Sequence, residues 1–148
     1  MKIKTLVLST LLCSSFAQAS SDIMTHHAYA RATPPNAPTS AVFVTLMNKG
    51  AEDRIIISAT TPAAGNVELH DVLKDGDVMK MRQIETIDIP ANGQVELKPG
   101  SFHIMLFDLK KPFVDGDSID VELTFKNGEK QTFNAPIKKV MAGMKHHH

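Results

Sequence analysis

The chain has 148 residues, 43% of them hydrophobic, and its 16 basic side chains are balanced by 16 acidic ones. This length and composition predict one globular domain with an apolar core. The balanced charge excludes a nucleic-acid-binding protein, because such a protein needs a clustered basic excess.

The first 19 residues have the three regions of a secretory signal peptide. Residues 1–4 form a basic head, residues 5–16 form an apolar run, and Ala17-Gln18-Ala19 is the small-x-small sequence that precedes cleavage. The apolar run is shorter than the roughly 20 residues that cross a bilayer, which argues against a membrane anchor. We therefore expect a cleaved leader, export to the periplasm, and no stable membrane insertion of the mature chain.

The single cysteine, Cys13, lies inside this leader. Attachment of a lipid at Cys13 is the competing interpretation, but Leu12 precedes it at a position where lipid-attachment sites carry a small residue. A mature chain without cysteine has no disulfide and no thiolate for a metal ion. This excludes a blue-copper electron-transfer site, which requires a Cys ligand, and it excludes thiol–disulfide chemistry.

Most of the mature chain consists of short predicted strands separated by turns. They follow a mixed segment at residues 23–31 and a proline-rich loop at residues 33–38. The predicted strands are residues 40–48, 54–60, 65–70, 86–89, 94–97, 102–109, 118–126 and 129–135. Asn127-Gly128 predicts a hairpin between the last two strands. No window shows a helical period, so the sequence predicts an all-β sandwich or barrel.

Four side chains in the middle of the chain form an unusual candidate ligand set, namely His70, Met81, His103 and Met105. Soft thioether sulfur combined with imidazole suits Cu(I). Zn(II) is normally held by thiolate, imidazole and carboxylate, and Mg(II) or Ca(II) by oxygen. The ligand types therefore favour a copper(I) carrier.

Turn geometry suggests how the first two ligands meet. Asp75-Gly76 fits the centre of a two-residue hairpin turn. A hairpin closed there would place His70 directly opposite Met81, with their Cβ atoms roughly 5 Å apart. Met79 would lie on the same side as Met81 and is the natural substitute ligand.

Strand periodicity suggests how the other two ligands meet. His103 and Met105 are separated by one residue, so they project from the same side of their strand, while Ile104 and Leu106 project from the other side. Uniting the two pairs of ligands requires this strand to lie beside the hairpin or across from it. Taken singly, each ligand is more simply an ordinary core or surface residue, and only the combination favours a metal site.

The spacing H-x10-M-x21-H-x-M resembles the pattern of the periplasmic PCuAC-type copper chaperone family. The resemblance covers about residues 22–138, and all four motif positions are present. The flanking sequences that also match are Ala30-Arg31-Ala32-Thr33-Pro34-Pro35, Glu68-Leu69-His70, Met79-Lys80-Met81-Arg82, Glu96-Leu97-Lys98-Pro99-Gly100 and His103-Ile104-Met105-Leu106.

The resemblance implies a cupredoxin-like Greek-key β-barrel or sandwich at residues 20–138 that holds Cu(I) through the four side chains near its surface. It also implies a chaperone that passes copper to the copper-site subunit of cytochrome c oxidase, sometimes together with a Sco-type protein. Neutral ligands would let an acceptor with thiolate donors take the ion by exchange. We expect a monomer without enzymatic activity, since the sequence offers no acid–base pair or nucleophile arrangement.

Residues 139–148 are expected to form a flexible tail rich in Met and His. Its candidate secondary ligands are Met141, Met144, His146, His147 and His148. Some members of the family have similar tails that bind additional copper, so the resemblance implies a further capture site here, including one for Cu(II). His-rich tracts bind metal by composition only, and the three final histidines could instead be the remnant of a purification tag.

Other functions stay open from the sequence. The same site would serve a periplasmic protein that sequesters copper or confers copper resistance. A β-sandwich interaction module, of a different functional class, would need no metal at all. A copper oxidase and a haem protein with His and Met axial ligands are further alternatives.

Overall fold

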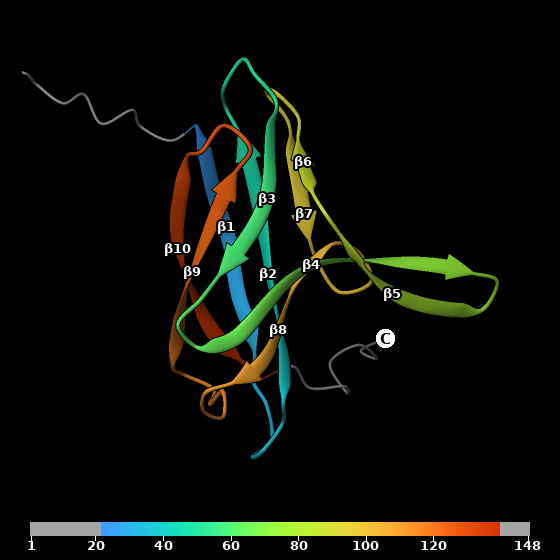
Figure 1. The fold of residues 1–148 in the computed structure, drawn as a ribbon, viewed down its shortest axis with the longest axis vertical. Helices are drawn as coiled ribbons and strands as arrows, with labels where there is room; N and C mark the ends of the chain where they lie inside the picture. The colour runs from blue at the N-terminus through green and yellow to red at the C-terminus, as the bar shows by residue number, and fades with distance from the viewer. Residues whose placement is uncertain (1–21, 140–148) are drawn as a thin grey trace, which may run out of the picture.

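The computed structural model describes residues 22–139, which form ten β-strands and no helix (Figure 1). The strands are β1 (Ile23–Arg31), β2 (Thr39–Asn48), β3 (Arg54–Thr60), β4 (Ala64–Asp75), β5 (Val78–Ile84), β6 (Ile87–Ile89), β7 (Gln94–Leu97), β8 (His103–Leu109), β9 (Ser118–Phe125) and β10 (Lys130–Lys138). The predicted all-β class is therefore confirmed. The leader at residues 1–19 and nearly all of the predicted tail lie outside the described residues, so both stay predictions.

β1 is a strand that sequence periodicity did not predict. It forms an antiparallel pair with β2. The register of this pair shifts between His26 and Tyr29, where His27 has a positive φ of 56°. A bulge of this kind adds a residue to one strand and breaks the period of two. This interruption explains why residues 23–31 look like a mixed segment in the sequence.

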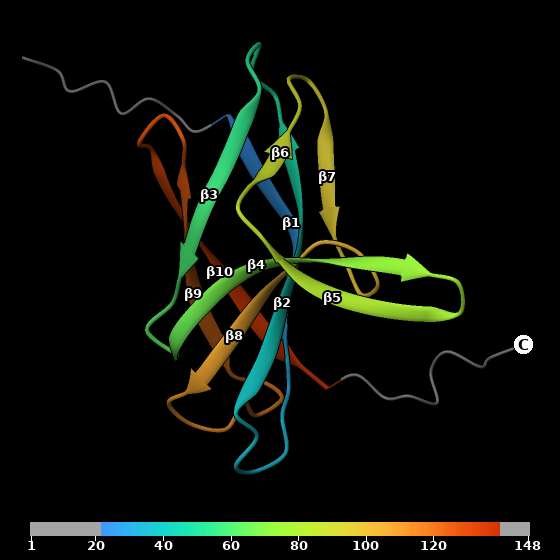
Figure 2. The same ribbon diagram turned by 45° about the vertical axis from the view of Figure 1, so that its right-hand side comes forward.

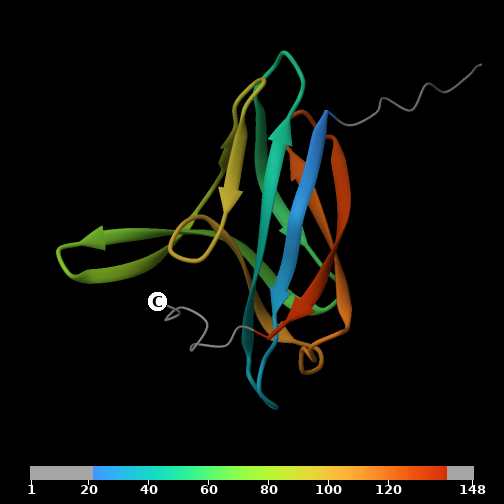
Figure 3. The ribbon, with the colours of Figure 1, turned by 180° about the vertical axis from the view of Figure 1, so that it is seen from behind.

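The strands follow one path of pairings, β5-β4-β8-β2-β1-β10-β9-β3-β6, and β7 pairs with the second half of β2. Among the described pairs, β1–β10 is parallel and the others are antiparallel. The path folds over on itself, so that β3 and β9 pack across from β1 and β2, and β10 continues from its partner β1 (Figures 2 and 3). The hairpin predicted at Asn127-Gly128 is confirmed, because it joins β9 to β10 and Gly128 has a φ of 91°.

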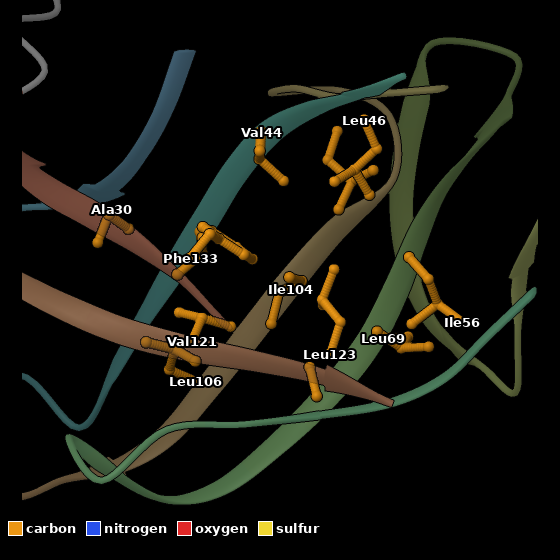
Figure 4. Close-up of a cluster of buried hydrophobic side chains, with 14 of the residues drawn as sticks. Ala30, Val44, Leu46, Ile56, Leu69, Ile104, Leu106, Val121, Leu123 and Phe133 are labelled. Atoms are coloured by element: carbon orange, nitrogen blue, oxygen red, sulfur yellow. The ribbon is translucent and has the colours of Figure 1, made fainter. Parts of the chain in front are cut away.

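Side chains on the inner faces of the strands form one hydrophobic core (Figure 4). Ile104 and Leu106 of β8 and Leu123 of β9 are completely buried. Full burial of such a side chain contributes roughly 1.5–3 kcal/mol. Because alternate residues of β8 point into this core, His103 and Met105 lie on its outer face, in agreement with their spacing. We call the outer face of β5, β4, β8, β2 and β1 the site face.

β4 and β5 form a hairpin that projects sideways from the body of the protein (Figure 2). Asp75 pairs with Val78, so the two central turn residues are Gly76 and Asp77. The turn predicted at Asp75-Gly76 is therefore wrong by one residue. Gly76 has a positive φ of 62°, whereas Asp77 does not have a positive φ. This is the pattern of a type II′ turn, in which glycine occupies the first central position.

The shifted turn changes the partner of His70. His70 pairs with Gln83, and Met81 pairs with Val72, so the predicted direct opposition of His70 and Met81 is wrong. The register differs from the prediction by two residues along β5, and a shift of two keeps each side chain on its predicted face. Met81 is a diagonal neighbour of His70 on the site face, at roughly 7–8 Å, and Met79 shares that face.

A cross-link can test this register in a chain that starts at Ser20 and therefore lacks cysteine. Leu73→Cys with Lys80→Cys places two thiols directly opposite one another, and we expect them to form a disulfide under mild oxidation. The control, Leu73→Cys with Val78→Cys, would be opposite only in a hairpin closed at Asp75-Gly76 and should oxidise much more slowly. Thiol quantification over time measures both rates, and faster closure of the control pair would contradict the described register.

Candidate metal centre

Two histidines from adjacent strands meet on the site face. β4 and β8 form an antiparallel pair in which His70 lies directly opposite His103. The centroids of the two imidazole rings are 5.6 Å apart. Two imidazoles that share one ion through bonds of about 2 Å have centroids roughly 5–6 Å apart. The separation therefore fits a shared ion without movement of either strand.

Each ring has one nitrogen that is held and one without a partner. His103 Nδ1–H donates to the Ser101 carbonyl oxygen at 3.0 Å, and His70 Nε2–H donates to a Glu68 carboxylate oxygen at 2.8 Å. His103 Nε2 and His70 Nδ1 are buried and have no hydrogen-bond partner among the described residues. Since a carbonyl or an ionised carboxylate can only accept, each held nitrogen carries a proton, and in the neutral ring the other nitrogen presents a lone pair. Metal-binding histidines are supported in this way.

Three thioethers gather beside these rings. A cavity of about 320 Å³ is lined by Met79 and Met81 from β5 and by His103 and Met105 from β8. Met105 is half-buried, whereas Met81 is 63% exposed and Met79 is 57% exposed. The side chains of Ala41, Phe43 and Val72 also line the cavity. The cavity thus has a buried side formed by β8 and an exposed side formed by the hairpin.

Small residues leave room for the thioethers. Ala41 of β2 lies directly opposite Met105, so only a methyl group occupies the neighbouring position on the site face. Gly100, in the loop between β7 and β8, has a φ of 83°, and a Cβ atom added there would lie 3.8 Å from Met79 Cε. A larger side chain at Gly100 would be strained in this conformation and would extend toward Met79.

The structure brings all four predicted ligands to one face. Met81, His103 and Met105 line the same cavity, and His70 lies against His103 beside it. The predicted substitute ligand, Met79, lines this cavity too. The candidates in the predicted tail lie outside the described residues and stay predictions, namely Met141, Met144, His146, His147 and His148.

Burial lowers the pKa of His103 below its ordinary value of 6.5. The hydrogen bond to the Ser101 carbonyl acts in the opposite direction, and the positive charge of Arg31 lowers the pKa further. The His103 ring is therefore neutral at pH 7, which is the form that binds a metal ion.

Sequence reasoning missed the residues that support the two imidazoles. Glu68 precedes His70 by two residues and so shares its strand face, a spacing that could have revealed it. Ser101 acts through its backbone carbonyl, for which a sequence gives no signal. The Phe43 ring of β2 is tilted by 44° against the His103 ring at a centroid distance of 6.2 Å, and this contact depends on strand pairing over a long sequence separation.

Within residues 22–139, no group of three or more His, Cys, Asp and Glu side chains lies close enough together to hold a metal ion. The side chains that line the cavity beside the two imidazoles are the thioethers of Met79, Met81 and Met105.

The sequence of residues 23–137 matches the family model described as "Putative lipoprotein LpqE-like". The chain belongs to this LpqE-like family. One curated relative, "Putative lipoprotein Lxx21020" of Leifsonia xyli subsp. xyli (strain CTCB07), is 33% identical over 100 residues. The match covers 67% of this chain and 60% of the relative, so the chain spans less than two thirds of the relative's length.

Solved structures of PCuAC domains share the fold of this LpqE-like chain. The solution structure of CuI-DR1885 from Deinococcus radiodurans is 29% identical with a TM-score of 0.67, and the match covers 87% of this chain and 86% of that one. The copper-bound PCuAC domain from PmoF2 has a TM-score of 0.69 at 19% identity, over 82% of this chain and 97% of that one. The resemblance to the PCuAC-type family and the cupredoxin-like β fold are thereby confirmed.

The described part of the LpqE-like chain contains no helix with the length and hydropathy that a membrane crossing requires. The description of the family as a lipoprotein family fits a protein that works outside the cytoplasm. Cleavage of the leader and residence in the periplasm stay predictions.

The lowered pKa of His103 predicts how stability depends on pH. Between the folded-state pKa and 6.5, the unfolded chain binds a proton at His103 that the folded protein does not bind. The free energy of unfolding of the metal-free protein should therefore decrease as the pH falls below about 6.5, until the folded-state pKa is passed. Urea denaturation between about pH 5 and about pH 8 measures this change.

His103→Gln should remove this component of the pH dependence, and His27→Gln, at an exposed position of β1, is the matched control. An imidazole NMR titration of wild-type protein provides the second measurement. A His103 midpoint above 6.5 would contradict the burial argument.

Proposed function

We propose that this protein binds one Cu(I) ion through His70, Met81, His103 and Met105 and carries it in the periplasm as a copper chaperone. The main support is the pair of buried, unpartnered ring nitrogens on directly opposed residues, beside a cavity with three thioethers. A buried polar atom left unpaired costs about 1–3 kcal/mol. One soft ion bound here would remove that cost for both rings.

The ligand types support Cu(I) over other ions. Imidazole and thioether are neutral donors that suit a soft monovalent ion, whereas Cu(II) favours tetragonal nitrogen and oxygen ligands. The apolar walls formed by Phe43 and Val72 also disfavour a doubly charged ion, because uncompensated charge is costly in an apolar environment. The Cu(I) form of DR1885, which is 29% identical to this chain, supports the same choice.

The exposure of the ligands differs in a way that suits transfer. His103 is 4% exposed, whereas Met81 is 63% exposed on the projecting hairpin. An acceptor that approaches the hairpin side can displace Met81 first, and Met79 can replace Met81 during the exchange. Because all of these ligands are neutral, an acceptor with thiolate donors binds Cu(I) more strongly and can remove it.

For the acceptor, we propose the copper-site subunit of cytochrome c oxidase, with a Sco-type protein as a second partner. This proposal rests on the PCuAC-type resemblance. The alternative is a copper-sequestering or resistance protein, which would bind the ion and not pass it on. We further propose that the predicted tail captures additional copper, including Cu(II), and that the activity is binding and transfer rather than catalysis.

Anaerobic titration of metal-free protein with Cu(I), in competition with a Cu(I) chelator, tests the proposed function. We expect one tightly bound ion per chain. Met81→Leu with Met105→Leu keeps similar volumes and should weaken the affinity by on the order of 100-fold or more, since two of four ligands are lost. X-ray absorption on the loaded wild type should count two sulfur and two nitrogen neighbours.

Met24→Leu with Met47→Leu is the matched control, because these two residues form a directly opposed thioether pair on β1 and β2. This control should bind Cu(I) as wild type does. Absence of a tightly bound ion, or an unchanged affinity after Met81→Leu with Met105→Leu, would reject the proposal and favour a metal-independent interaction module.

The support of His70 by Glu68 gives a separate prediction. Glu68→Ala removes the acceptor that holds His70 Nε2–H, so the ring loses its fixed tautomer and orientation. We expect Cu(I) affinity to fall by roughly 10–100-fold, and Glu68→Gln, which keeps an acceptor oxygen, to lose less. The same competition titration measures both variants. Glu96→Ala, at an exposed carboxylate of β7, should bind as wild type does, and an equal loss in this control would contradict a specific role of Glu68.

A further inference from the structure

Two cations lie over the site face next to the metal cavity. Arg31 ends β1 and Lys138 ends β10, and the two residues are partners across these strands. The guanidinium carbon of Arg31 is 5.6 Å from the centre of the Phe43 ring, and Lys138 Nζ is 5.9 Å from the centre of the Tyr29 ring. Tyr29 and Phe43 are opposite one another on the site face, so both charges lie on that face. We call Arg31 and Lys138 the basic flank.

Neither charge of the basic flank is paired. Within residues 22–139, no carboxylate lies within ion-pair distance of either side chain. Asp71 pairs with Arg82 and Glu96 pairs with Lys98, whereas Glu68 accepts a hydrogen bond from the neutral His70 ring and keeps its negative charge. Lys74, on the site face of the hairpin, is also without an ion-pair partner in this part of the chain. Among the described residues of the site face, the cations Arg31, Lys138 and Lys74 thus outnumber the uncompensated carboxylate of Glu68, which makes the mouth of the metal cavity electropositive.

Arg31 also connects the metal cavity to a second cavity. The second cavity has a volume of about 810 Å³ and shares Arg31 with the metal cavity in its lining. Its walls include Pro34 and Pro35 from the loop after β1 and Phe113 and Val114 from the loop after β8, with Lys139 nearby. We call the two cavities, which share Arg31, the groove; its lining contains the cations Arg31 and Lys139 and one carboxylate, Asp115.

We propose that this groove and the basic flank form the docking surface for an acidic segment of the copper acceptor. This inference rests on the proposed function. Carboxylates of the segment bind Arg31 and Lys138, and the donor atoms of the acceptor then lie at the exposed side of the cavity, next to Met81. Arginine binds a carboxylate through two parallel hydrogen bonds, which fixes orientation as well as position. Complementary charge also accelerates association by about tenfold or more at low salt.

Charge argues against the two other candidate occupants of the groove. A second copy of this chain would face the groove with the same cations in a symmetric dimer, and like charges repel. The chain's own segment after Lys139 contains Lys145 and no Asp or Glu, so its side chains do not complement the groove either. An acidic partner is the occupant that the charges fit.

Two synthetic acceptor peptides can test this surface. Both contain one Cys-Gly-Gly-Cys segment, flanked by aspartates in one peptide and by lysines in the other. Protein loaded with one Cu(I) ion is mixed with each peptide under anaerobic conditions at low ionic strength, and the rate of copper transfer is measured by stopped flow. We expect faster transfer to the acidic peptide by about tenfold, and loss of this preference in high salt.

Variants assign the preference to the basic flank. Arg31→Gln with Lys138→Gln should lower the rate for the acidic peptide and leave little difference between the peptides. The transfer rates of wild type and variant are compared for the same peptide, so that a difference in thiol reactivity between the two peptides does not affect the comparison. Lys126→Gln, in the loop between β9 and β10, removes a charge away from the groove and should keep the wild-type preference. Equal rates for both peptides with wild type, or a preference that survives the double variant, would overturn the proposal.

A copper-free measurement separates this proposal from the proposed function. Serine versions of the two peptides are titrated into metal-free protein, and backbone amide NMR shifts are recorded. We expect shifts at Arg31, Thr33 and Val114 with the acidic version and none with the basic version. Failure to load Cu(I), with these shifts present, would reject the copper function and keep the acidic docking surface. Normal loading without these shifts and without a rate preference would reject the docking surface alone.

Discussion

The direct opposition of His70 and His103 across β4 and β8 is the constraint on which the metal centre depends. The same register places Leu69 opposite Ile104, and both of these side chains are in the hydrophobic core. A slip of one residue on either strand would turn its core side chains to solvent and its histidine inward. Burial of the inner face thus fixes the imidazoles on the outer face, so the core determines the geometry of the centre without contributing a ligand.

The hydrogen bonds of the two rings show how this geometry becomes a binding site. Glu68 and the Ser101 carbonyl each hold one ring nitrogen, and the opposite nitrogens stay unpartnered and buried. Unpaired buried acceptors lower the stability of the metal-free protein by about 1–3 kcal/mol each. A bound ion would offset this cost, so ion binding would raise the stability of the protein.

Sequence reasoning reached the fold class and the composition of the candidate site, because both depend on local patterns. The period of two placed His103 and Met105 on one face, and the structure agrees. The hairpin turn was harder, since Asp75-Gly76-Asp77 contains two possible two-residue turns, and the strand pairing and the φ values are needed to distinguish them. The flanking cation Arg31 and the Phe43 ring could not be predicted, because their contacts depend on pairings among β1, β2 and β8 that no local pattern encodes.

The position of the site on an outer sheet face, rather than inside the barrel, determines how an ion can leave it. His103 is fixed by the core strand β8, whereas Met81 and Met79 lie on a hairpin whose outer strand, β5, is at the end of the sheet path. The most exposed of the proposed ligands thus lie on the strand at the end of the sheet path, and Arg31 lies across the cavity on β1. In the proposed transfer, an incoming acceptor would meet a replaceable thioether on one side of the cavity and a cation on the other, while the two imidazoles would keep their bonds to the ion. This arrangement suits stepwise ligand exchange, because only the ligands reachable from solvent have to be displaced first.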